Sequence, residues 1–124
     1  DSGAARGLGD GYKRQDIAYL NAHGPGTQQC DTVEAAVLDE VLGGAAQIYS
    51  VKPLTGHCQG AAAAVEVAAA ALGYAEEQVP APPTVAPGHP RLLDGLTPML
   101  SGLTLKTSLG MGGHNAAVVL APAV

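Results

Sequence analysis

Histidine and lysine residues that could take part in chemistry follow short apolar runs in this sequence. His23 lies in the glycine-rich turn "HGPGT", directly after the apolar run at residues 17–22. Lys52 follows a second apolar run, and His57 comes five residues later, just before a stretch rich in alanine. Near the C-terminus, a glycine loop at residues 110–113 would let the backbone approach a ligand closely. Groups of these types could bind an anion or another ligand.

The positions of these groups predict that they converge. In a parallel sheet the carboxyl ends of neighbouring strands meet at one edge, which would bring His23 and Lys52 together. His57 stands where a helix is expected to begin, and backbone N–H groups there favour an anion. Each residue also has an ordinary explanation, since a loop histidine or a lysine after a strand is often simply solvated. The residues alone indicate an enzyme-like site and leave that alternative open.

The elements that must position these groups can be read from the apolar pattern. Strands are expected at residues 17–22, 47–51, 100–106 and 115–120. Helices separate the first three strands, which predicts an α/β fold with parallel strands. The glycine loop between the last two strands predicts an antiparallel hairpin.

Two main helices are expected. Asp31 is predicted to be the N-cap of the first, with Glu34 completing a capping box, and the glycine pair at 43–44 ends it. Val33, Val37 and Val41 recur every four residues, with Ala36, Leu38 and Leu42 beside them, which predicts that one side of this helix faces a core. The second helix is predicted to run from Thr55 or Gly56 to about Glu77, buried all round. Residues 79–90, with five prolines, are expected to form an extended surface connection.

Composition narrows the function classes. The chain has 124 residues, which suits one domain, and its net charge of −5 argues against nucleic acid as a partner. No run approaches the roughly 20 apolar residues of a membrane span. With two cysteines and no secretion signal, a reduced cytoplasmic protein is expected. The four histidines lack ligand spacing, so no metal site is predicted.

Three blocks of the sequence resemble the C-terminal half of β-ketoacyl synthases, the thiolase-fold condensing enzymes of fatty acid and polyketide assembly. "NAHGPGTQQCDTVEA" is similar to the family's H-G-T-G-T-x-x-x-D-x-x-E loop. "SVKPLTGHCQGAAAAVE" is similar to S-x-K-x-x-x-G-H-x-x-x-A-A-G, and "SLGMGGHNAAVVL" to S-F-G-F-G-G-x-N-A. The resemblance implies part of a thiolase-like half, with a mixed, mostly parallel sheet of about four strands. The expected division is a flexible loop at 1–16 and this domain at 17–124.

The resemblance also implies residue roles. His23 and His57 would hold the thioester carbonyl of malonyl-carrier protein and stabilise the enolate left by loss of CO₂. Lys52 and Glu66 would complete the catalytic set. Glu66 is implied to be the buried partner of Lys52, because an isolated buried carboxylate is costly. Further residues are implied to bind the carrier's pantetheine arm (Thr27, Gly110, Met111, Gly112 and Gly113) or to be structural (Asp31, Glu34 and Asn115). No cofactor is implied beyond the phosphopantetheine arm that carries the substrate.

The sequence departs from the family pattern at important positions. The nucleophilic cysteine of the family lies in the N-terminal half, and neither Cys30 nor Cys58 matches it. Pro25 replaces one threonine of the histidine loop, and Met111 replaces a gating phenylalanine. The chain is therefore expected to be inactive alone and to need a cysteine-bearing partner or parent chain, together with an acyl carrier protein. The alternative is a non-catalytic ketosynthase-like subunit that stabilises or shapes a synthase complex.

The resemblance carries one further expectation about the sheet. A strand and helix that begin the family's C-terminal half cannot be found in this sequence, and that strand would lie beside the last one. The apolar segment 116–120 is then left as an open edge, which favours pairing or aggregation. A partner chain, a second copy or another part of the protein is expected to cover it.

Overall fold

The computed structural model describes residues 12–86 and 88–123. Its elements follow in the order η2 (Arg14–Asp16), β1 (Ile17–Asn21), α1 (Gln28–Leu42), β2 (Gln47–Tyr49), α2 (Lys52–Thr55), η3 (Gln59–Ala61), α3 (Ala62–Glu76), β3 (Gln78–Val79), β4 (Thr97–Pro98), β5 (Leu103–Gly110) and β6 (His114–Leu120). Most of the N-terminal loop expected at 1–16 lies outside the described residues, and its last three residues form the short helix η2.

The main sheet has four strands in the order β2-β1-β5-β6. Strand β1 pairs in parallel with both β2 and β5, whereas β5 and β6 form an antiparallel hairpin. This confirms the predicted α/β fold with a mixed, mostly parallel sheet of four strands and two main helices. The topology sets the carboxyl ends of β1 and β2 side by side, which is the edge where His23 and Lys52 were expected.

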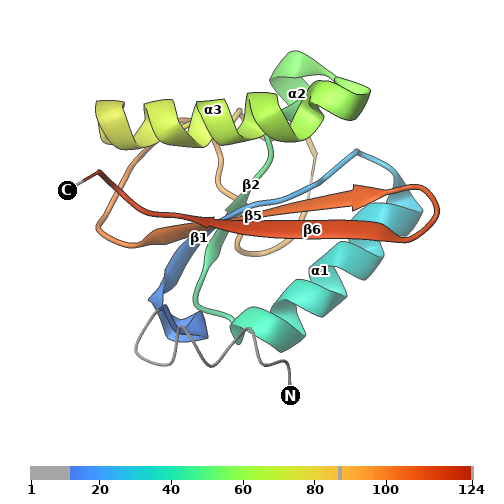
Figure 1. The fold of residues 1–124 in the computed structure, drawn as a ribbon, viewed down its shortest axis with the longest axis horizontal. Helices are drawn as coiled ribbons and strands as arrows, with labels where there is room; N and C mark the ends of the chain where they lie inside the picture. The colour runs from blue at the N-terminus through green and yellow to red at the C-terminus, as the bar shows by residue number, and fades with distance from the viewer. Residues whose placement is uncertain (1–11, 87, 124) are drawn as a thin grey trace.

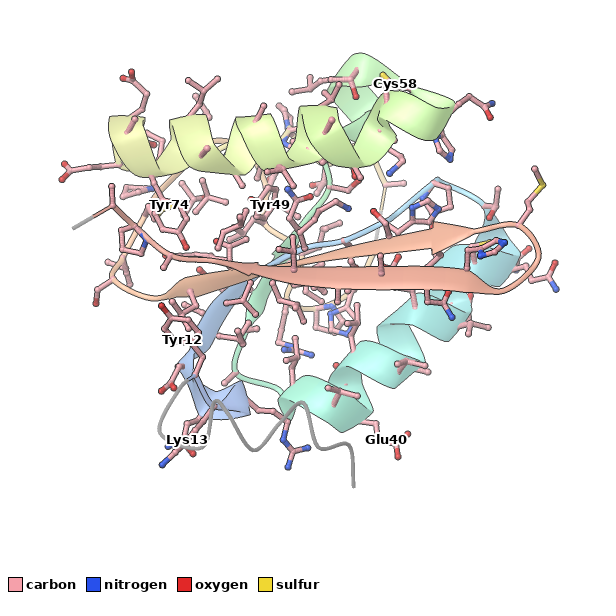
Figure 2. The ribbon with its side chains drawn as sticks, in the orientation of Figure 1. Tyr12, Lys13, Glu40, Tyr49, Cys58 and Tyr74 are labelled. Atoms are coloured by element: carbon pink, nitrogen blue, oxygen red, sulfur yellow. The ribbon has the colours of Figure 1, made fainter. Side chains whose placement is uncertain are left out.

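The sheet is covered on both faces, with α3 on one side and α1 on the other (Figure 1). Leu38 and Leu42 of α1 pack with Leu20 and Ile48 of the sheet in one apolar cluster. On the opposite face, Tyr19 and other side chains of the sheet pack with Val79 and Ala81 of the following segment; the tyrosines Tyr49 and Tyr74 lie between α3 and the sheet (Figure 2). The core is thus two thin apolar layers, one on each face.

Helix α1 differs from its prediction in its start and in part of its buried side. It begins at Gln28, with Thr27 at the N-cap position, and not after Asp31. Val33, Val37 and Val41 are exposed, and the stripe one residue further along, Glu34, Leu38 and Leu42, is buried. Both stripes have a spacing of four, so periodicity alone cannot choose between them, and the longer leucines reach the sheet. The predicted end is correct, because Gly43 adopts the left-handed conformation at φ 64°.

The second main helix begins later than predicted. Helix α2 ends at Gly56, whose φ of 70° and ψ of 176° are incompatible with a continuing helix, and α3 begins only at Ala62. The prediction of burial all round is also wrong. Only one stripe of α3 is buried, while Leu72 on its outer side is 65% exposed. Within the described residues α3 has the sheet beneath it and nothing above it.

Residues 79–90 are not simply a surface connection. Strand β3 pairs antiparallel with β4 in a small second sheet that the sequence pattern did not predict. Val79 and Ala81 are almost fully buried, at 0% and 3% exposure. The segment therefore begins as part of the core under α3 and becomes exposed only at Pro83. Short two-residue strands carry too little periodic signal to be recognised from sequence.

Candidate functional site

The two histidines of the predicted site lie together. Their ring centroids are 5.4 Å apart and the rings are nearly perpendicular, at 80°. His23 follows β1 and is 7% exposed, whereas His57 lies in the segment between α2 and η3 and is exposed. Both rings line one cleft of about 510 Å³. The expected convergence of the two histidines is therefore observed.

The walls of this cleft come from three parts of the chain. Beside the histidines, Gln59, Gly60, Ala62 and Ala63 line it from η3 and the start of α3. The β5–β6 hairpin contributes the opposite wall, with Ser108, Leu109, Gly110, Gly113, His114, Asn115 and Ala116. None of these lining residues is acidic, so the cleft offers hydrogen-bond donors and small side chains to a ligand.

His57 presents a defined donor. The backbone N–H of Gln59 donates to Nδ1 of His57 at 3.1 Å, which leaves the proton of a neutral ring on Nε2. Gln59 adopts a left-handed backbone with φ of 54°, an uncommon conformation for a residue with a side chain. This strained residue aims its N–H back at the ring. A fixed ring with a free N–H suits polarisation of a carbonyl oxygen.

The backbone of His23 is held from both sides. Glu34 accepts hydrogen bonds from the N–H groups of His23 and Gly24, each at 2.8 Å, and a third from the Thr107 hydroxyl at 3.0 Å. On the other side, Nζ of Lys52 donates to the carbonyl oxygen of His23. The predicted capping box is therefore wrong: Glu34 points into the fold and anchors the histidine loop, because α1 begins three residues before Asp31.

The loop turns sharply after His23. Gly24 has a φ of 45°, and a side chain there would meet Cβ and Oγ of Ser50 at 2.9 Å. Asp31 accepts a hydrogen bond from the N–H of Gly26 at 3.3 Å and so supports the turn from the first part of α1. Glycine is required at position 24 both for its backbone conformation and for the close approach of Ser50, which follows β2.

Behind the cleft lies a buried group of charges. Glu66 is ion-paired with Lys52, the partnership that the resemblance implied. It is also paired with Lys106 on β5, whose Nζ lies 2.6 Å from Oε2 of Glu66. Lys106 was not among the residues predicted from the sequence; its signal there is a single cation within the mostly apolar strand run 103–109. The three side chains are at most 6% exposed, so both lysines depend on the carboxylate of Glu66 to compensate for lost hydration.

The environment of His23 disfavours its charged form. Burial lowers the pKa of His23 below its usual 6.5, and the charge of Lys52 acts in the same direction. Glu34 opposes this shift, whereas Lys106 and His57 add to it. The pKa of Lys106 is lowered too, first by its burial, with the ion pair to Glu66 working against that shift. A neutral imidazole at position 23 is the form that this site favours near pH 7.

Other predicted residues are placed less centrally. Gly112 and Gly113 have φ values near 85° and form the tight turn of the β5–β6 hairpin, where Met111 is 94% exposed. Gly110, Gly113 and Asn115 line the cleft, but Thr27 is exposed and lies outside its lining. The structure thus brings together His23 and His57 with Lys52 and Glu66 behind them, and leaves Thr27 apart.

Neither cysteine belongs to the cleft. Cys30 is exposed on α1, and Cys58 is half-buried next to His57, where its side chain points to the outside of the molecule (Figure 2). Among the described residues no group of His, Cys, Asp or Glu could hold a metal ion. In the same part of the chain, no helix is long and apolar enough to cross a membrane.

A larger hollow, of about 780 Å³, lies between α1 and the segment 82–93. Its lining is mainly apolar and includes neither of the paired histidines. At its rim, His89 and Arg91 both contact Asp39 and tie this segment to α1. The smaller cleft carries the chemically capable groups, so it is the candidate site.

Comparison with known proteins shows which family this fold and its cleft belong to. The family model "Beta-ketoacyl synthase, C-terminal domain" matches residues 9–85, and the chain belongs to this family. The 3-oxoacyl-[acyl-carrier-protein] synthase 2 of Synechocystis is 31% identical over 121 residues, covering 85% of this chain and 27% of the relative. Nodulation protein E of a Rhizobium species is 33% identical, covering 86% of this chain and 28% of the relative.

Solved ketosynthase structures show the same fold. The ketosynthase of module 6 of the bacillaene synthase from Bacillus subtilis superposes with a TM-score of 0.80 at 24% identity, over 90% of this chain and 23% of that one. The ketosynthase domain KS8 of OzmH from Streptomyces albus gives 0.79 at 28% identity, over 97% and 37%. The ishigamide ketosynthase/chain length factor gives 0.80 at 25% identity, over 90% and 29%. The chain thus spans a little over a quarter of the curated relatives quoted above.

Proposed function

We propose that this chain supplies the histidine and lysine part of a ketosynthase site, for decarboxylative condensation of an acyl thioester with a malonyl thioester on an acyl carrier protein. The observation that carries this proposal is the pair of imidazoles, 5.4 Å apart at one cleft. The name of the Synechocystis relative, 3-oxoacyl-[acyl-carrier-protein] synthase 2, supports the substrate class. The carrier protein is the proposed partner.

The chemistry of each group follows from its surroundings. When the malonyl group loses CO₂, its electron pair is left as an enolate, whose oxygen needs hydrogen-bond donors that are already in place. His57 has a free Nε2–H, and His23 is kept neutral, so both rings can donate to this oxygen. Lys52 holds the His23 carbonyl and therefore acts behind the ring. The enolate carbon then attacks the acyl thioester, and the thiolate that carried the acyl group leaves.

That thiolate has to come from elsewhere. Cys30 and Cys58 both lie outside the cleft, so the acyl group is carried by a cysteine of a partner or of a parent chain. The proposed site is complete only when that second part closes over the cleft. The chain by itself is expected to form no condensation product.

The test combines the chain with a cysteine-bearing ketosynthase partner, acyl-carrier protein and malonyl-carrier protein. His23→Ala and His57→Ala are each expected to reduce product formation by about 100-fold, the typical loss of one positioned oxyanion donor. His89→Ala is the matched control, because His89 contacts Asp39 away from the cleft and its loss should leave the rate unchanged. Assembly is measured in parallel by gel filtration. Full activity of both cleft variants would refute a catalytic role.

A second function is favoured by specific observations. The chain carries neither a cysteine in the cleft nor a buried gate, since Met111 is almost fully exposed. A ketosynthase/chain length factor is among its structural neighbours, at a TM-score of 0.80. A non-catalytic subunit that shapes a synthase complex would tolerate both histidine substitutions while its removal abolishes assembly. The same set of variants therefore separates the two functions.

A further inference from the structure

Lys106 is a buried lysine that the proposed chemistry does not use. It lies on β5 and is 2% exposed. Its Nζ is paired with Glu66, donates to the carbonyl oxygen of Thr107, and reaches the carbonyl oxygen of Ala22 at 3.4 Å. These contacts place an ammonium group directly beneath the end of β1, one residue before His23.

The charge balance makes this lysine unnecessary for Glu66. Lys52 pairs with Oε1 of Glu66 and Lys106 pairs with Oε2, so one carboxylate serves two cations. Lys52 alone would neutralise the carboxylate. The second buried carboxylate, Glu34, is occupied by backbone N–H groups and by Thr107. A surplus buried cation is costly, which points to a role other than neutralising Glu66.

The two lysines contact the carbonyl oxygens of consecutive residues at the end of β1. Lys106 reaches the carbonyl oxygen of Ala22, and Lys52 donates to the next carbonyl oxygen, that of His23. Asn21, the last residue of β1, is tied by its side-chain amide to the backbone carbonyl of Glu66 at 2.8 Å. Three successive residues, 21–23, are thus held by groups on α2, α3 and β5.

We propose that Lys106 is a positioning residue of the candidate site, which fixes the exit of β1 at Ala22 and holds a second positive charge behind the His23 ring. The inference rests on the proposed function only because it treats His23 as a catalytic residue. The contacts of Lys106 do not depend on that function. Lys106 touches no substrate and acts through the backbone and through electrostatics.

The charge of Lys106 has a measurable consequence. The charged and titratable groups that act on His23 are Lys52 on α2, Lys106 on β5, Glu34 on α1 and the neighbouring His57. The two lysines and His57 disfavour the imidazolium, and Glu34 favours it. Removing Lys106 while keeping the fold should therefore raise the pKa of His23. A residue that merely filled space would leave that pKa where it is.

The experiment follows the His23 ring by NMR through a pH titration of protein labelled with ¹³C-histidine, with the signal assigned from His23→Gln. Lys106→Met replaces the ammonium by a neutral group of similar length, and Lys106→Gln also keeps a hydrogen-bond donor. Lys13→Met is the matched control, because Lys13 is exposed and remote from the cleft. We expect the His23 pKa to rise in both Lys106 variants and to stay unchanged in the control.

Activity gives a separate readout. In the complex with the cysteine-bearing partner, kcat should fall by roughly 10- to 100-fold in Lys106→Met, the scale of a misplaced reacting group. If wild type makes no product, the proposed function fails while the titration still tests Lys106. A folded Lys106→Met or Lys106→Gln protein whose His23 titrates as in wild type would overturn the inference. Failure of both variants to fold would also overturn it, since Lys106 would then be core support.

Discussion

At the scale of single residues, the site depends on a few buried polar groups whose partners are backbone atoms. Glu34 accepts hydrogen bonds from the N–H groups of His23 and Gly24, and Lys52 donates to the carbonyl oxygen of His23. Hydrogen bonds to a charged group contribute about 1.5–3 kcal/mol each when buried. The histidine loop owes its conformation to these contacts, because its glycines alone would permit many others.

Glu34→Gln tests this anchor. The amide keeps one acceptor oxygen but lacks the charge, so one N–H of the loop is left with a poorer partner. We expect the free energy of unfolding to fall by about 1.5–3 kcal/mol in urea denaturation. Glu40→Gln is the matched control on the exposed side of the same helix and should change stability by less than about 0.5 kcal/mol. Equal effects of the two substitutions would contradict an anchoring role for Glu34.

The lowered pKa of His23 predicts a pH dependence of stability. Because the folded-state pKa lies below the unfolded value of about 6.5, the unfolded chain binds more protons on acidification. The associated stability is complete above about pH 6.5 and is lost as the pH falls from there towards the folded-state pKa. His23→Gln should show a shallower decline between pH 7 and 5 in urea titrations. Parallel curves for wild type and variant would show that His23 does not titrate differently on folding.

At the scale of elements, the helices are defined by the side that they bury. Helix α1 buries Leu38 and Leu42, although the valines one position earlier have the same spacing. Helix α3 places Glu66 on its buried stripe and its small residues against the sheet. Tyr74 of α3 sets its hydroxyl within hydrogen-bond distance of the Leu120 carbonyl on β6, at 3.1 Å, and so ties the helix to the edge strand.

A pair of alanine substitutions tests the buried side of α1. Leu38→Ala should lower the free energy of unfolding by about 2–5 kcal/mol, because it removes methyl groups from a packed cluster. Val37→Ala, its neighbour on the exposed side, should change it by less than about 0.5 kcal/mol. Thermal or urea unfolding of the two variants is sufficient. A larger loss of stability in Val37→Ala than in Leu38→Ala would contradict the observed orientation of α1.

At the scale of the whole molecule, the sheet ends in an uncovered strand. Strand β6 pairs only with β5 among the described residues, and Val118 and Val119, on opposite faces of it, are 45% and 39% exposed. An exposed apolar edge is a template for further pairing. Since the chain spans only 27% of a curated relative, we expect the cysteine-bearing part of a ketosynthase to lie against this edge.

Hydrogen exchange of the β6 amides can test whether a second part of a ketosynthase covers this edge. Amides at 116–120 that lack a partner in β5 should exchange quickly in the chain alone and be protected by at least about tenfold when the cysteine-bearing part is present, since a new ladder would hold them. Amides of β1, which is paired on both sides, should be unchanged. Equal exchange at 116–120 in both samples would place the second part elsewhere.

Several features of this protein followed from sequence alone. Apolar runs, glycine turns and the alternation of strands with helices depend on short-range propensities, and they gave the α/β class, the four main strands and the hairpin turn correctly. The position of His23 and Lys52 at one edge followed from the parallel order of β1 and β2. The pairing of Lys52 with Glu66 came from the resemblance to β-ketoacyl synthases and is present.

Only the tertiary structure decided which partners the buried polar groups have. Glu34 was assigned to a local cap but reaches the loop after β1 and Thr107, 73 residues away. Lys106 reaches Glu66 because β5 lies beside β1 and beneath α3, which nothing near position 106 encodes. Such contacts depend on sheet order and helix rotation, and these are set by packing of the whole core. Local pattern therefore specified the elements, and long-range packing specified the environment in which His23 works.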